Sequence, residues 1–221
     1  MARNSLFALV AAVLVAGGAL WALQGGQPAT TPIPAANAQS SGDVDTSGIA
    51  EMTVGDPEAP VEVIEYASFT CPHCATFHET VFPQIEENYV DTGKVHFVYR
   101  EVYFDRYGLW AGMVARCGGA DRYFGIVDMI YERQREWTQG EDAAQVVQNL
   151  RKIGKVAGLD DSQLDACLSD AGKAEALYAL YQKNAEMHDI NSTPSFVIDG
   201  EKFSNMSYAD FAETLDEKLA E

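Results

Sequence analysis

Two cysteines separated by two residues follow a predicted buried strand, and no other part of the sequence constrains the fold as strongly. Residues 61–67 have the apolar, β-branched composition of a strand, and Cys71-Pro72-His73-Cys74 begins the helix that follows. A Cys-x-x-Cys at a strand-to-helix junction is typical of redox proteins. Pro72 suits the first helical position, because its missing N–H group is not needed there.

The position of each cysteine predicts its role. The first turn of a helix has unpaired N–H groups and a partial positive charge, so it favours a thiolate over a thiol. Cys71 is therefore the predicted nucleophile, and Cys74, one turn further on, is predicted to resolve the mixed disulfide. His73, when protonated, would add positive charge beside the thiolate.

The two cysteines allow three other interpretations. A zinc site needs four ligands, and His78 is the only close extra candidate in the sequence. Covalent haem needs a histidine directly after the second cysteine, where this chain has Ala75. A purely structural disulfide is the third, although a strained Cys-x-x-Cys loop suits exchange chemistry better. We therefore expect neither a metal nor an organic cofactor.

Two segments resemble a known family. Residues 65–74, which end in Cys-Pro-His-Cys, resemble the active-site segment of the DsbA-like thiol:disulfide oxidoreductases of the bacterial periplasm. Residues 193–197, Thr-Pro-Ser-Phe-Val, resemble the cis-proline segment of the same thioredoxin-fold family. The resemblance runs from about residue 51 to the C-terminus. The Cys-Pro-His-Cys motif is fairly specific within the superfamily, whereas the Thr-Pro segment is shared by nearly all of it.

Glu65 is an unexpected residue for a central strand, because a buried acid is costly unless it is partnered or functional. It lies six residues before Cys71, where its carboxyl group could sit beneath the dithiol. We predict that Glu65 relays the proton of Cys74, and DsbA-like proteins carry an acid at this offset. The alternative is an exposed edge position. We expect surface or hydrogen-bonded positions, without a redox role, for His78 and His96.

The segment near residue 193 returns the chain to the sheet. In this fold the Thr193–Pro194 peptide bond is expected to be cis and to lie opposite the dithiol. The backbone of Thr193 would then pair with an extended substrate chain, as in strand addition. Asp199-Gly200 predicts a hairpin turn, and Ser207 predicts the start of the closing helix.

Residues 106–188 contain no strand pattern. Helical periodicity occurs in five stretches: 109–117, 120–133, 143–156, 162–168 and 174–188. An all-α insertion is the DsbA-like architecture. We therefore predict an α/β thioredoxin-like fold formed by residues 51–105 and 189–221, with residues 106–188 inserted as a helical subdomain.

Two further cysteines, Cys117 and Cys167, lie in this predicted subdomain. The leading interpretation is that they form a structural disulfide, because the chain has an even number of cysteines and an export signal. Two buried free thiols and intermolecular pairing remain as alternatives.

The N-terminus predicts export. After Arg3, residues 6–23 form an uncharged run of apolar and small residues, typical of a signal peptide or a membrane anchor within residues 1–23. A small-x-small site ends at Ala38, so the chain is either cleaved there or held at the inner membrane. Residues 24–50 are rich in small residues and proline, which predicts a flexible linker.

Together these features predict a monomeric periplasmic oxidoreductase. The net charge of −18 argues against nucleic acid as a partner. The protein would donate its Cys71–Cys74 disulfide to unfolded secreted proteins with free cysteines, and the resemblance implies reoxidation by a membrane protein of the DsbB type. Three alternatives stay open: a reductase or isomerase kept reduced, a substrate-holding chaperone or assembly factor with a secondary dithiol, and metal delivery through Cys71, Cys74 and His78.

Overall fold

A five-stranded mixed sheet forms the centre of the fold, in the order β1-β3-β2-β4-β5. The computed structural model describes residues 44–140 and 142–221, so the predicted signal segment and most of the predicted linker lie outside the described residues. The strands are β1 (Met52–Val54), β2 (Val61–Ala67), β3 (Val95–Glu101), β4 (Ser195–Ile198) and β5 (Glu201–Ser204). The central pair, β2 and β3, is parallel, and the other neighbours are antiparallel.

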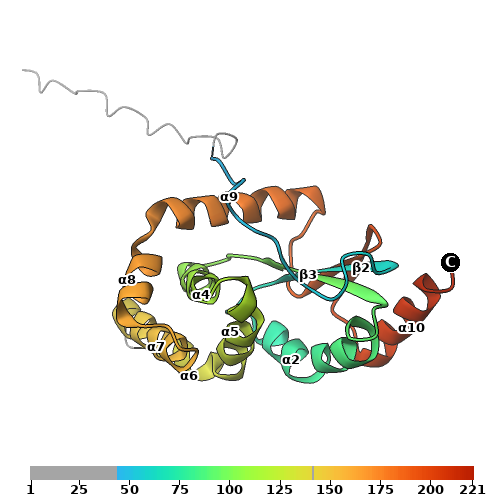
Figure 1. Ribbon diagram of the computed structural model, residues 1–221, viewed down its shortest axis with the longest axis horizontal. Coiled ribbons are helices and arrows are strands. Elements are labelled where there is room, and N and C mark those ends of the chain that lie inside the picture. Colours follow the sequence, from blue (N-terminus) through green and yellow to red (C-terminus); the bar gives the residue numbers. More distant parts are fainter. Residues whose placement is uncertain (1–43, 141) are drawn as a thin grey trace, which may run out of the picture. The chain divides into compact units, whose positions relative to one another are not determined.

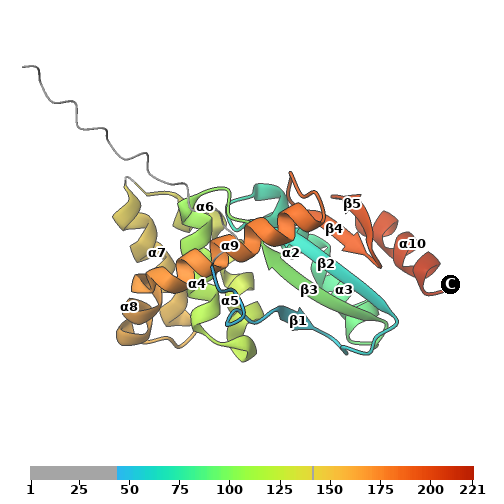
Figure 2. The same cartoon turned by 90° about the horizontal axis from the view of Figure 1, so that it is seen from above.

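Helices cover both faces of the sheet (Figures 1 and 2). One face packs against α2 (Pro72–Thr80), α3 (Phe82–Ile85), the π-helical turn η1 (Glu86–Val90) and α10 (Tyr208–Lys218). The other face packs against α9 (Ala171–Met187), which contributes Tyr181. Alternate residues of β2 therefore enter two different cores: Val61 and Val63 face α2, and Ile64 and Tyr66 face α9.

A proline inside a helix bends or breaks it, and Pro83 follows the helix that begins at Pro72. That helix ends at Thr80, and α3 begins at Phe82 with Pro83 in its first turn. A proline is tolerated in a first turn because the N–H groups there have no intrahelical acceptor. The break therefore lies just before the proline.

The helical insertion lies between β3 and β4. It consists of α4 (Arg106–Cys117), α5 (Ala120–Glu132), α6 (Gln134–Thr138), α7 (Ala143–Val156), α8 (Asp161–Ser169) and α9. α7 has the predicted bounds, whereas α6 was not predicted, since five residues are too few to show helical periodicity. α8 begins one residue earlier than expected, because Asp160 and Gln163 form a capping box.

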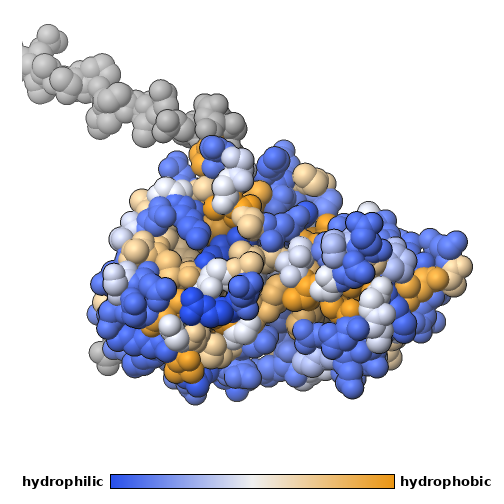
Figure 3. Space-filling view, in the orientation of Figure 1, coloured by the Kyte–Doolittle hydropathy of each residue, from blue (hydrophilic) through white to orange (hydrophobic). Residues whose placement is uncertain are grey.

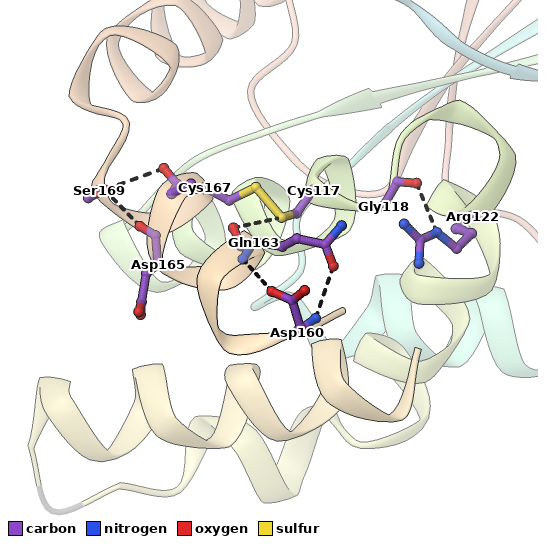
Figure 4. The surroundings of a disulfide bond; sticks show 9 residues. Cys117, Gly118, Arg122, Asp160, Gln163, Asp165, Cys167 and Ser169 are labelled. Atoms are coloured by element: carbon purple, nitrogen blue, oxygen red, sulfur yellow. Dashed lines mark hydrogen bonds between the residues drawn. A yellow bond between two sulfur atoms is a disulfide. The ribbon is translucent and has the colours of Figure 1, made fainter. Parts of the chain in front are cut away.

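Cys117 and Cys167 form a disulfide that joins the end of α4 to α8 (Figure 4). The capping box of Asp160 and Gln163 lies beside it, and Gln163 is in contact with Cys117 through its carbonyl oxygen. The disulfide therefore connects two helices of the insertion, and its two cysteines are 50 residues apart in the sequence.

The last residues of the predicted linker are part of the folded unit. The carbonyl oxygen of Ala50 accepts a hydrogen bond from Arg116 Nη1 at 2.8 Å, and Ile49 packs against the core around Tyr103. The prediction of a flexible linker up to residue 50 is wrong for this end. The hydrogen bond from Arg116 to Ala50 holds this end of the segment in place. The amino-acid composition of the segment does not reveal that contact.

The local signals near the C-terminus are confirmed. Asp199 and Gly200 both have positive φ angles and connect β4 to β5, and the side chain of Ser207 caps α10. The face shown in Figure 3 is largely hydrophilic, in keeping with the net charge of −18. No helix within residues 44–140 and 142–221 is long and apolar enough to cross a membrane.

Candidate active site

The two cysteines of the motif lie at the mouth of α2. Cys71 is the N-cap residue and is half-buried, whereas Cys74 is in the first turn and has no exposed surface. Both are free thiols. The Cys71 thiol donates a hydrogen bond to the carbonyl oxygen of Thr193 at 3.3 Å. Of the two sulfur atoms, only that of Cys71 is therefore accessible for thiol–disulfide exchange with a second protein.

The surroundings make the two thiols chemically unequal. A hydrogen bond from the Cys74 thiol lowers the pKa of Cys71 to about 5, with smaller contributions from Thr193 and from the backbone N–H groups of Cys74 and His73, against the opposing effect of burial. Burial raises the pKa of Cys74, and its hydrogen bond to Cys71 and the charge of Glu65 raise it further. At neutral pH the reduced pair thus carries one thiolate, on Cys71, and one thiol, on Cys74.

His73 contributes to the site through its backbone, and the predicted effect of its imidazole charge stays a prediction. Its imidazole is exposed, and it is the backbone N–H group that helps to lower the pKa of Cys71. The helix N-terminus therefore acts on the thiolate through individual N–H donors. Pro72 is the first residue of α2, as the sequence predicted.

The Thr193–Pro194 peptide bond is cis, as predicted. Pro194 is buried directly before β4, and Thr193 is half-buried beside Cys71. The topology thus brings residues from the two ends of the folded chain, 122 positions apart, into hydrogen-bond contact.

Glu65 is fully buried in β2, on the face that packs against α2. Its Oε2 atom lies 2.9 Å from Nε2 of His78, whose side chain is 1% exposed. His78 was expected at the surface or in a hydrogen bond without a redox role; the structure buries it against the predicted proton relay. The sequence held a signal for this contact, since His78 follows Cys74 by four residues and so lies on the same face of α2.

Two tyrosines close this buried site. The ring of Tyr131 stacks on the imidazole of His78, with centroids 4.5 Å apart, and its hydroxyl lies 2.6 Å from that of Tyr99. Burial raises the pKa of both phenols well above their usual value, so both stay neutral. In contrast, His96 lies near the surface, with Nδ1 3.9 Å from the exposed Glu62.

Two positioning contacts were missed by sequence reasoning. The side-chain amide of Gln134, in α6, donates hydrogen bonds to the carbonyl oxygens of Phe69 at 2.8 Å and Cys71 at 2.9 Å. The hydroxyl of Thr70 donates to Asp105 Oδ2 at 2.6 Å, and Asp105 also caps α4. The helical insertion therefore holds the active-site loop from two sides. No sequence pattern marks Gln134, because it lies in the short helix that periodicity cannot detect.

Metal delivery through Cys71, Cys74 and His78 finds no support in this geometry, because His78 is bound to Glu65. Within the described residues, no group of three or more His, Cys, Asp or Glu side chains is placed to hold a metal ion.

Comparison with known proteins agrees with this fold and site. The family profile described as Thioredoxin matches residues 47–217. The chain belongs to the thioredoxin family. This thioredoxin-family protein is 31% identical over 172 residues to a Rickettsia bellii protein named, provisionally, a protein-disulfide oxidoreductase; the match covers 77% of this chain and 65% of the relative, slightly less than two thirds of the relative's length.

Solved structures place this thioredoxin-family chain among DsbA-type proteins. The crystal structure of α-DsbA1 from Wolbachia pipientis is 26% identical with a TM-score of 0.72, and the match covers 78% of this chain and 92% of that one. BdbD from Bacillus subtilis has the same fold at 20% identity and a TM-score of 0.68, with 77% and 94% of the two chains covered. The predicted thioredoxin-like fold with a helical insertion is confirmed.

Proposed function

We propose that this protein is an exported thiol:disulfide oxidoreductase that donates its Cys71–Cys74 disulfide to cysteine-containing secreted proteins. The observation that carries the proposal is the inequality of the two thiols: the pKa of Cys71 is lowered to about 5, whereas burial raises that of Cys74. A stabilised Cys71 thiolate favours the reduced form, so the oxidised form readily gives up its disulfide.

The reaction has two exchange steps. A substrate thiolate attacks the accessible sulfur of Cys71, the Cys71–Cys74 bond breaks, and the electron pair passes to Cys74, which takes up a proton. The second thiolate of the substrate then attacks the substrate sulfur of the mixed disulfide, and Cys71 leaves as a thiolate. The substrate loses two electrons and the Cys71–Cys74 pair gains them.

Glu65 is the proposed proton donor in the first step. It is fully buried, and once it has given up its proton, its negative charge raises the pKa of Cys74, so the proton stays on the sulfur. Thr193 is the proposed docking point, where an extended substrate chain would pair with its backbone beside Cys71. No metal or organic cofactor takes part in these steps.

The setting of this activity follows from the N-terminal segment. An export signal within residues 1–23 would deliver the chain to the periplasm, either free after cleavage near Ala38 or anchored to the inner membrane. A membrane protein of the DsbB type would accept the two electrons and restore the disulfide. The relatives' names support disulfide exchange in general, and the export and reoxidation steps are part of this proposal.

The deciding measurement is the reduction potential of the Cys71–Cys74 pair in glutathione buffers. A value above about −180 mV would support disulfide donation, and a value near about −270 mV would indicate a thioredoxin-like reductant instead. Replacing Cys71 with serine separates both from a chaperone, because a substrate-holding protein would keep its activity in that variant.

A further inference from the structure

The buried pair of Glu65 and His78 lies beside a pocket at the protein surface. A pocket of about 260 Å³ lies between α2, α3 and η1 on one side and α5 on the other, and His78 lines it together with Tyr131. Glu65 does not line this pocket. The imidazole thus stands between the buried carboxyl and the pocket.

The pocket is acidic. Its lining contains four carboxylate side chains and no lysine or arginine: Glu79, Glu86, Asp128 and Glu132. Burial raises the pKa of Glu86 and of Asp128, against an opposing effect of His78 on each. Both carboxyl groups therefore hold their protons to a higher pH than an ordinary carboxyl group does.

Two buried atoms at this site have no hydrogen-bond partner among the described residues: Glu65 Oε1 and His78 Nδ1. Their other atoms, Oε2 and Nε2, bond to each other at 2.9 Å. Each side chain thus uses one polar atom in the hydrogen bond between Glu65 and His78, and its other polar atom has no partner among the described residues. Buried polar atoms are nearly always partnered, so two open atoms in one pair point to a role other than stability.

We propose that His78 carries protons between the acidic pocket and Glu65. This inference rests on the proposed function, in which Glu65 protonates Cys74. When the Cys71–Cys74 bond breaks, Glu65 gives its proton to the Cys74 sulfur. His78 passes the proton on Nε2 to Glu65 and takes up another at Nδ1 from the pocket. One proton enters for each thiolate protonated, and the reverse sequence operates when the disulfide forms again.

His78 is therefore a positioning residue that acts through Glu65. The titratable groups that surround it come from every adjoining element except α3, which has none: Glu65 of β2, Tyr99 of β3, Glu79 of α2, Glu86 of η1, and Asp128, Tyr131 and Glu132 of α5. The two tyrosines stay neutral, so carboxylates are the groups that exchange protons with the imidazole.

The test measures how fast glutathione opens the oxidised Cys71–Cys74 disulfide in the full chain, in single turnovers at several pH values. His78→Ala is expected to slow this step by about tenfold or more near neutral pH, less than the roughly 100-fold loss typical of a group that transfers the proton directly, because His78 acts through Glu65. Added imidazole should restore the rate. Pyrazole, which has the same shape but is not protonated near neutrality, should not. A His96→Ala variant should react at the wild-type rate, and neither imidazole nor pyrazole should change that rate.

Each other result overturns the inference. Equal rescue by imidazole and pyrazole would mean that His78 only fills space. A wild-type rate in His78→Ala, together with a slow Glu65→Gln variant, would show that His78 is not part of the proton relay and that Glu65 is still the proton donor. A wild-type rate in Glu65→Gln would reject the proton relay itself, while the reduction potential still tests disulfide donation separately. If His78→Ala does not fold, His78→Gln fills the site without carrying a proton, and a wild-type rate there would overturn the inference.

Discussion

Gln134 donates a hydrogen bond from its side-chain amide to the carbonyl oxygen of Cys71, across 2.9 Å and 63 residues of sequence. The same nitrogen also donates to the carbonyl oxygen of Phe69. The helical insertion is therefore in direct contact with the backbone of the active site, and the loop that carries the dithiol depends on a residue outside the thioredoxin-like part.

Gln134→Ala is expected to lower the free energy of unfolding by about 1–3 kcal/mol, because it leaves two carbonyl oxygens without their donor in a buried site. Urea unfolding of the reduced protein measures this loss. Gln145→Ala is the matched control, since Gln145 is exposed and, within the described residues, its side chain bonds only to Asn149. Equal stability of the two variants would contradict a positioning role for Gln134.

The reduced protein is expected to gain stability with rising pH between about 5 and 9. Within this range the folded protein holds the Cys71 thiolate, since its pKa is lowered from 9.0 to about 5, whereas the unfolded chain holds the thiol. The unfolded state thus binds more protons, so the free energy of unfolding rises with pH, and the gain disappears as the pH falls through about 5.

Urea titrations of reduced wild type and of Cys71→Ser, from about pH 5 to pH 8, measure this effect as a difference between the two curves. The pH range ends at about 8 because cysteines of the unfolded chain begin to ionise above that pH. Thiolate absorbance should follow a single transition near pH 5 in the wild type. Parallel stability curves for the two proteins would show that the Cys71 thiolate is not stabilised by the fold.

Removing the Cys117–Cys167 disulfide is expected to cost about 4 kcal/mol of stability, from the entropy that a closed loop of this length removes from the unfolded chain. The Cys117→Ala/Cys167→Ala double variant should therefore unfold at a lower temperature, compared with wild type in the same redox state of Cys71 and Cys74. Thiol counting should find no free thiol in the oxidised wild type, with or without denaturant. Two thiols that appear only on unfolding would disprove the pairing.

The buried ion pair of Arg116 and Glu101 should matter more than any exposed pair. Arg116 donates from Nε and Nη2 to the two carboxylate oxygens, each at 2.6 Å, and Tyr123 donates to the same carboxylate. Arg116→Met leaves that buried carboxylate without its charged partner, so we expect a loss of about 3–5 kcal/mol.

Arg151→Met is the comparison for this pair. Arg151 bonds to the exposed carboxylates of Asp161 and Asp165, and we expect a much smaller loss, because water screens exposed ion pairs. Thermal unfolding of both variants decides between the two expectations. Similar losses would mean that burial adds nothing to the contribution of Arg116.

Local rules were enough where the residues that decide a feature are neighbours in sequence. Cys71 and Cys74 are separated by two residues, the hairpin turn at Asp199 and Gly200 needs only its own backbone conformation, and Ser207 caps a helix that begins at the next residue. Each of these depends on spacing and on the chemistry of a single turn. The strand that carries Glu65 followed from the apolar residues on either side, whereas the sequence left its side chain open between a buried relay and an exposed edge position, and the structure buries it.

Only the tertiary structure decided which distant groups meet. Glu65 and His78 lie in different elements, and their contact depends on how α2 packs on the sheet. Gln134 reaches Cys71 because α6 folds back against the active-site loop. Thr193 was expected opposite the dithiol from the family resemblance, and the contact forms because β4 joins the sheet beside β2. The physical reason is that packing, hydrogen-bond geometry and burial depend on side chains from several elements at once, and no periodicity within one segment contains that information.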